Sequence, residues 1–310
     1  MSLLHISSSP HIHTKRNTTN IMLDVVISLL PATLAGFLLF GLRALSVVLM
    51  CIAVCVISES LFNKIAKKPD TVGDLSAVVT GLLLGLNLPA TTPLWQAVVG
   101  SLFAIIIVKC IFGGIGCNIV NPAITARVFM LVAFSSLAKP AFPVDAVSSA
   151  TPLVSLAEGK VPELWDLFIG NIGGAIGETS ALALLLGGVY LLVRRVISWH
   201  MPISFIGSVF VLSLAIEGLD FMAAIAWVLS GGLILGAFFM ATDYVTSPAT
   251  PKGKIIFGVG AGIITVLIRF WGVYPEGVSF AILFMNILTP YINSWSQRKL
   301  FGGKNDEKSH

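Results

Sequence analysis

Apolar residues occur in long stretches along this chain, and short polar connections separate them. A helix that crosses a bilayer needs about 20 mostly apolar residues. Stretches that approach this length cover residues 22–42, 44–62, 73–88, 95–113, 118–137, 166–193, 202–217, 221–242, 254–273 and 277–295. The one long polar connection is 138–165. The pattern predicts an all-α integral membrane protein with about ten transmembrane helices.

The composition excludes a soluble globular domain. Of the 310 residues, 56% are hydrophobic and 11% are charged, and the mean hydropathy is +0.93. Soluble domains carry roughly 25% charged residues, so this chain has too few charges to cover a water-facing surface. The first 21 residues are polar and basic, with no apolar run before a cleavage site, so we expect the first spanning helix to direct insertion.

Basic residues predict the orientation, because cytoplasmic loops of membrane proteins are enriched in Lys and Arg. With the N-terminus in the cytoplasm, one side receives Lys15, Arg16, Lys64, Lys67, Lys68, Arg194, Arg195, Lys252, Lys254, Arg298 and Lys299. The opposite side receives only Arg43, Lys139 and Lys160. We therefore expect the terminal segments 1–21 and 297–310 in the cytoplasm and the connection 138–165 outside it. The net charge of +4 follows from this distribution and does not indicate nucleic-acid binding.

The two halves of the chain, 22–137 and 166–296, resemble each other. Three pairs of segments carry the similarity: 81–85 with 232–236, 104–114 with 262–272, and 118–122 with 286–290. Each segment of the second pair also carries one basic residue, Lys109 or Arg269. Five helices in each half is an odd number, so the second half would enter the membrane in the opposite sense. The sequence thus predicts two inverted five-helix repeats with binding sites between them, although glycine-rich apolar helices can also resemble one another by chance.

Glycines and prolines predict irregular backbone inside the spans. Gly113, Gly114 and Gly116 permit a break between helices or a close backbone approach. Pro122 and Pro290 are expected to kink their helices at matching places.

Several ionisable residues fall in or near the apolar stretches, where a charge is costly. They are Glu59, Lys109, Arg127, Glu178, Asp243 and Arg269. One interpretation is a path for a translocated cation, or charges that adjust the redox potential of a bound cofactor. The alternative is interhelical ion pairs or side chains that reach the membrane surface.

Neither the four cysteines nor any known enzyme motif identifies an activity. Cys51 and Cys55 share one helix face and are either ligands of a metal or iron–sulfur centre or small apolar packing residues; Cys110 and Cys117 have no distinctive spacing. A phosphate-binding loop, a dinucleotide-binding fingerprint and a zinc-protease motif are all missing from the sequence.

The segment DAVSSATPL, residues 145–153, is small and rich in hydroxyl groups in an otherwise apolar chain. Small neighbours leave the Thr151 hydroxyl accessible, and Pro152 favours an extended conformation at Thr151. On these grounds alone the segment is either a presented modification site or an ordinary surface loop.

The four residues Ser148, Ser149, Ala150 and Thr151 resemble the flavinylation motif Ser/Thr-Gly-Ala-Thr of the RnfD and NqrB family of membrane subunits. Ser149 departs from the usual glycine but is still small. The blocks 73–89, 113–129, 243–253 and 274–293 are similar to further family signatures, in the same order. The resemblance implies a ten-helix inverted repeat and a phosphoester between Thr151 and FMN, which an extracytoplasmic flavin transferase installs.

Family members also hold a second, non-covalent flavin such as riboflavin. The break at 113–116 brings the amides of Asn118 and Asn121 to one place, where they could bond the polar edge of a flavin ring or satisfy freed backbone groups. The length of the chain favours the RnfD branch, since NqrB usually has a longer N-terminal region.

The resemblance implies a membrane subunit of an Rnf-type ferredoxin:NAD oxidoreductase in a bacterial plasma membrane. Such a subunit relays electrons and couples them to sodium or proton transport, with Rnf subunits A, B, C, E and G as partners. The alternatives are an NqrB-type subunit of a sodium-pumping NADH:quinone reductase, a flavin-free transporter or channel with the same repeat, and a structural scaffold of the complex.

Overall fold

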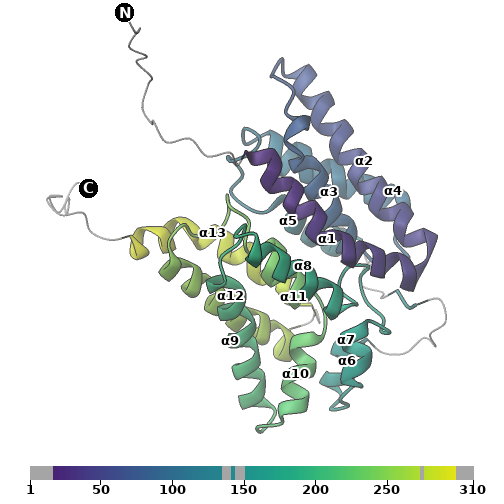
Figure 1. The fold of residues 1–310 in the computed structure, drawn as a ribbon, viewed down its shortest axis with the longest axis vertical. Coiled ribbons are helices and arrows are strands. Elements are labelled where there is room, and N and C mark those ends of the chain that lie inside the picture. Colours follow the sequence, from purple (N-terminus) through teal and green to yellow (C-terminus); the bar gives the residue numbers. More distant parts are fainter. Residues whose placement is uncertain (1–16, 135–140, 144–150, 273–275, 298–310) are drawn as a thin grey trace, which may run out of the picture.

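The computed structural model describes residues 17–134, 141–143, 151–272 and 276–297, and Figure 1 shows its fold. All regular secondary structure in these ranges is helical, apart from one isolated antiparallel bridge between Ala141 and Gly174. The first half contains α1 (Thr18–Phe40), α2 (Leu42–Ile65), η1 (Val72–Asp74), α3 (Ser76–Leu86), α4 (Leu94–Leu102), the π-helix η2 (Phe103–Cys110) and α5 (Pro122–Ala133). The predicted all-helical class is therefore confirmed for the described residues.

The second half of the chain is more broken than the first. It contains α6 (Pro152–Ala157), α7 (Leu164–Ile169), α8 (Ala181–Val193), α9 (His200–Ile216), α10 (Phe221–Leu229), α11 (Leu233–Leu235), the π-helix η4 (Gly236–Met240), α12 (Pro251–Trp271) and α13 (Val278–Ser296). Within the described ranges, three helices, α1, α2 and α12, are long and apolar enough to cross a membrane. The pair α10 and α11–η4 passes the same test together, with a 64° bend at its break. Five more apolar helices are shorter.

Polar residues just before the helices explain where several helices begin. Asn121, Ser180, Asp220 and Thr250 each accept a hydrogen bond from a free backbone N–H in the first turn of α5, α8, α10 and α12. Pro122 occupies the first position of α5, where a missing N–H costs nothing. The expected kink at Pro122 is therefore wrong, because this proline starts a helix; Pro290 does lie inside α13.

The expected continuous helix over 166–193 is also wrong. Helix α7 ends at Gly170, which has a positive φ of 112°, and α8 begins only at Ala181. A side chain at Gly170 would contact the backbone of Ser180 at 3.0 Å, so the chain folds back closely here. The predicted break near Gly113 is present: α5 follows η2 only after an irregular segment, 111–121.

The two halves meet where α1 packs along α8, and Figure 1 shows this junction between α2–α4 on one side and α9–α12 on the other. Gly187 permits the contact, because a Cβ there would overlap the carbonyl oxygen of Ser28. Within the halves, α2 packs on α3 and α9 packs on α12. Large apolar side chains remain exposed on the outside, among them Leu42, Ile65, Val193 and Trp295 at 75–77%. An outer surface of this kind faces lipid rather than water.

Candidate functional site

A cleft opens between the two halves of the chain. It encloses about 790 Å³, including space open to solvent. Its walls come from the start of α1, from α3, the end of η2 and the 115–123 segment, and from α8, η4 and residues 242–245 of the second half. The lining is mostly apolar, with a few polar residues: Ser76, Thr80, Lys109, Asn118, Asn121, Thr242, Asp243 and Tyr244. A concave, mainly apolar space with a few polar groups is typical of a cofactor site.

The expected amides lie on one wall of this cleft. Asn121 caps α5, since its Oδ1 accepts from Ala123 N at 3.0 Å and Ile124 N at 3.3 Å, and its Nδ2 donates to Met240 O at 3.4 Å. Asn118 Nδ2 donates to Val120 O at 3.2 Å. Both amides therefore satisfy backbone groups at the break, as one of the two sequence interpretations predicted.

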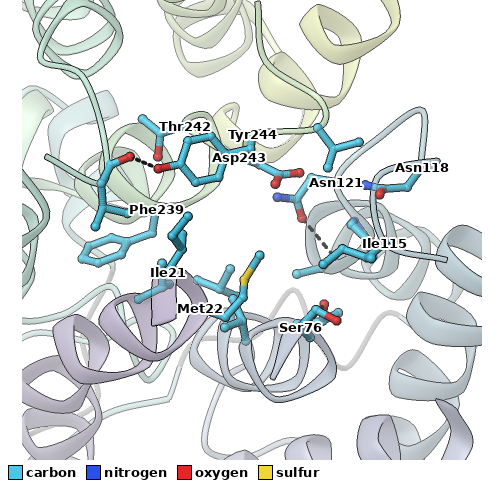
Figure 2. Close-up of a pocket in the computed structure, with 18 of the residues that line it drawn as sticks. Ile21, Met22, Ser76, Ile115, Asn118, Asn121, Phe239, Thr242, Asp243 and Tyr244 are labelled. Carbon is cyan, nitrogen blue, oxygen red and sulfur yellow. Dashed lines mark hydrogen bonds between the residues drawn. The ribbon is translucent and has the colours of Figure 1, made fainter. Parts of the chain in front are cut away.

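Asp243 adds a carboxylate to the same wall. It follows the broken helix of the second half and accepts from Thr246 Oγ1 at 3.0 Å. Figure 2 shows the Asp243 carboxylate beside the amides of Asn118 and Asn121, with Ile21, Met22 and Ser76 across the cleft. The hydroxyl of Tyr244 donates to Val196 O and closes a further part of the wall. The cleft therefore offers hydrogen-bond acceptors and donors on one side and apolar surface on the other.

Lys109 connects the cleft to a buried polar network. Its Nζ donates to Glu59 Oε2 at 2.7 Å and to Ser76 Oγ at 2.6 Å, and both charged side chains are at most 3% exposed. Glu59 Oε1 accepts from Thr71 Oγ1 at 2.7 Å. The Ser76 hydroxyl donates to Asp74. The structure thus brings two sequence candidates together as an interhelical ion pair between α2 and η2.

A second buried charge cluster lies between the middle of α5 and the C-terminal ends of α10 and α12. Arg127 Nη2 pairs with Glu276 Oε2 at 2.9 Å. Arg269 donates to the carbonyls of Trp227 at 2.5 Å and Ser230 at 2.9 Å, where a cation stabilises the C-terminus of α10. Glu178 interacts electrostatically with both arginines and with Glu276. The six ionisable candidates from the sequence are therefore divided between this cluster, the cleft and the Lys109 network.

Thr151 lies outside the cleft, at the N-cap of α6. Its backbone is extended (φ −63°, ψ 154°), as the following proline predicts. The side chain is partly exposed, and its Oγ1 accepts a long bond of 3.4 Å from Val154 N. Ser148, Ser149 and Ala150 lie outside the described residues.

Three of the four cysteines, Cys51, Cys55 and Cys110, belong to buried apolar clusters. Cys51, Cys55 and Cys110 are buried and Cys117 is exposed. Among the described residues, no group of three or more His, Cys, Asp or Glu could hold a metal. Sequence reasoning missed Asn286, whose amide accepts from Asn121 N at 3.1 Å and donates to Thr246 O at 3.2 Å when its amide nitrogen faces Thr246. The matched Asn-x-x-x-Pro segments were the signal that could have found it.

These features define a multi-pass membrane protein with a mainly apolar cleft between two helical halves and two buried charge clusters. The sequence profile of the NQR2, RnfD, RnfE family matches residues 5–302, and the chain belongs to this family.

Three relatives match nearly the whole chain. The D subunit of the Na⁺-translocating ferredoxin:NAD⁺ oxidoreductase complex of Acetobacterium woodii is 48% identical over 307 residues, which cover 96% of this chain and 95% of the relative. The D subunit of the proton-translocating ferredoxin:NAD⁺ oxidoreductase complex of Clostridium ljungdahlii is 41% identical over 320 residues, 97% of each chain. The D subunit of an ion-translocating oxidoreductase complex of Halorhodospira halophila is 34% identical, with 95% and 94% covered.

Proposed function

We propose that this chain is the D-type membrane subunit of an Rnf ferredoxin:NAD oxidoreductase complex, which relays electrons through flavin and couples them to ion transport. The near full-length match to two ferredoxin:NAD⁺ oxidoreductase D subunits carries this proposal. The chemistry of ferredoxin and NAD then belongs to partner subunits. We expect those partners to be Rnf subunits A, B, C, E and G in a bacterial plasma membrane.

Thr151 is the proposed attachment point of FMN through a phosphoester. Its partly exposed side chain and its long hydrogen bond of 3.4 Å from Val154 N support this role. The attachment requires a flavin transferase on the outer side, which agrees with the orientation expected from the basic residues. The FMN supplies one- and two-electron transfer when bound.

The cleft between the halves is the proposed site of a second, non-covalent flavin. Its mainly apolar lining with a few polar groups suits a tricyclic ring. Phe238, Phe239 and Leu83 offer apolar surface for the ring faces. Asp243 can accept a hydrogen bond from a ring N–H, and Asn118 and Lys109 can donate to ring carbonyls. The polar edge of a flavin ring carries a carbonyl, an N–H and a second carbonyl in turn, so its groups match these side chains.

The buried acids are proposed to carry or gate the coupling ion. Glu59 is the strongest candidate, since its partner Lys109 lines the cleft and would respond to charge on a bound cofactor. The relatives include both a sodium- and a proton-translocating complex, so the family chemistry allows either ion.

We also propose ten spans in two inverted repeats, 22–137 and 166–296, with both termini in the cytoplasm and Thr151 outside. The packing supports the repeat, because α2 packs on α3 and α4 in the first half as α9 packs on α10 and α12 in the second. Lys109 and Arg269 then lie near opposite membrane surfaces.

Electron transfer by the assembled complex provides the test of this function. In membranes, the complex that carries Thr151→Ala should assemble normally but should no longer reduce NAD with reduced ferredoxin. The control variant Thr125→Ala removes a local hydrogen bond to Asn121 O, and the complex that carries it should retain this activity. Full activity in an assembled Thr151→Ala complex would indicate a structural scaffold instead.

A further inference from the structure

Buried hydrogen-bond donors without partners gather around the break between α10 and α11. Among the described residues, five of seven such side-chain atoms lie there: Arg127 Nε and Nη1, Arg269 Nε, Ser230 Oγ and Thr179 Oγ1. All four residues are at most 6% exposed. Guanidinium groups only donate, so the three arginine nitrogens among these atoms need acceptors. Unpaired donors are costly in a protein interior, and a missing acceptor is therefore implied.

The nearby acids do not supply that acceptor. Arg127 pairs with Glu276 through Nη2 alone, and Glu276 is 28% exposed. Arg269 uses Nη1 and Nη2 on two neutral carbonyls. Within the described ranges, Arg269 and Glu178 form no ion pair shorter than 4.0 Å. Two buried cations thus keep unused N–H groups in one place.

The proposed flavin tether lies against this cluster. Leu153, two residues after Thr151, packs with Trp227 in a small apolar core. A Cβ built on Gly231 would lie 2.9 Å from Leu153 Cδ1 and 3.3 Å from Arg269 Nη2, so the α6 side chain and the guanidinium lie close together over this glycine. Figure 1 shows α6 beside α10. A ribityl phosphate on Thr151 separates the ring from its attachment point by many bonds, so the ring is not confined to the position of Thr151 itself.

We infer that Arg127 and Arg269 form the binding site for the acceptor edge of the flavin ring tethered at Thr151, and that their charges favour its reduced form. This inference rests on the proposed function. The ring edge carries two carbonyl oxygens and unprotonated nitrogen, which match the unused donors. On two-electron reduction with uptake of one proton, the ring gains a negative charge, and nearby cations in a dry site stabilise that charge.

Redox titration of the full-length chain tests this inference. The chain is produced with its flavin transferase, and the spectrum of Thr151→Ala is subtracted so that only the tethered flavin is followed. Arg269→Gln and Arg127→Gln should each make reduction at least tenfold less favourable, a potential lower by about 30 mV for a two-electron couple. Arg269→Lys, which keeps the charge, should shift the potential less than Arg269→Gln.

Lys160→Gln is the matched control, because it removes the same charge close to α6 at a residue that is 79% exposed and screened by water. Its potential should equal that of the wild type. If the tethered FMN has the same potential in both arginine variants as in Lys160→Gln, the inference is overturned, and water satisfies the arginine donors. If Arg269→Gln does not fold, Arg127→Gln decides the question alone. Wild-type chain without FMN on Thr151 would instead overturn the proposed function.

Discussion

Replacement of Lys109 by methionine should destabilise the protein strongly, because it leaves a buried carboxylate without its cation. Lys109 Nζ contributes two short bonds, 2.7 Å to Glu59 and 2.6 Å to Ser76. Both members of the ion pair are almost fully buried. Breaking one partner of such a pair costs about 3–5 kcal/mol. Glu59 keeps its bond from Thr71 at 2.7 Å, so we expect the lower half of that range.

The ion pair itself contributes less than the single variant suggests, since two charges are removed from water to form it. Glu59→Gln keeps a bond from Thr71 and should cost about 1–3 kcal/mol. The double variant Glu59→Gln/Lys109→Met removes both charges, so we expect it to be more stable than Lys109→Met alone. This recovery measures the coupling between the two side chains.

The assay is equilibrium unfolding of purified chain in detergent, followed by tryptophan fluorescence. A matched control is Lys160→Met, which removes an exposed charge with a loose ion pair of 3.6 Å and should change the unfolding free energy by less than about 0.5 kcal/mol. Strictly additive losses in the double variant would refute the contact between Glu59 and Lys109. If Lys109→Met lowers the unfolding free energy by no more than the control does, the burial of Lys109 is refuted.

Two further variants test the junction of the halves and the cleft. Gly187→Ala should lower the unfolding free energy by about 1–3 kcal/mol in the same assay, because its Cβ would overlap Ser28 O. The control Gly207→Ala has nothing within 4 Å of its Cβ and should be neutral or slightly stabilising. Equal effects of the two variants would contradict the packing of α1 on α8. Asn121→Ala should cost about 0.5–2 kcal/mol through loss of the α5 cap and should lower the content of extractable flavin; unchanged flavin content would exclude this wall from the cofactor site.

The sequence predicted those features that depend on local residue types. The positions of α1, α2, α12 and α13 followed from apolar stretches, and the break near Gly113 followed from three glycines that all adopt positive φ. Thr151 was predicted to be extended because of the proline after it, and it is. Such features depend only on residues that are close together along the chain, so a single sequence is enough to predict them.

Features that depend on distant residues were not predictable in the same way. Apolar character alone could not show that the stretch 166–193 folds back at Gly170, since hydropathy does not distinguish a span from a buried loop. Pro122 was expected to kink a helix, but the cap at Asn121 turns it into the first residue of α5. Lys109 and Glu59 were both suspected, yet their pairing across 50 residues depends on how α2 packs on η2.

The measurement that most directly tests the central claim is ultraviolet fluorescence of the denatured chain in a gel, after expression with the flavin transferase. Covalent flavin survives denaturation, whereas any flavin in the cleft is lost. We predict a fluorescent wild-type band and a dark Thr151→Ala band. Fluorescence in both bands would move the attachment to another residue, and a dark wild-type band would favour a flavin-free transporter.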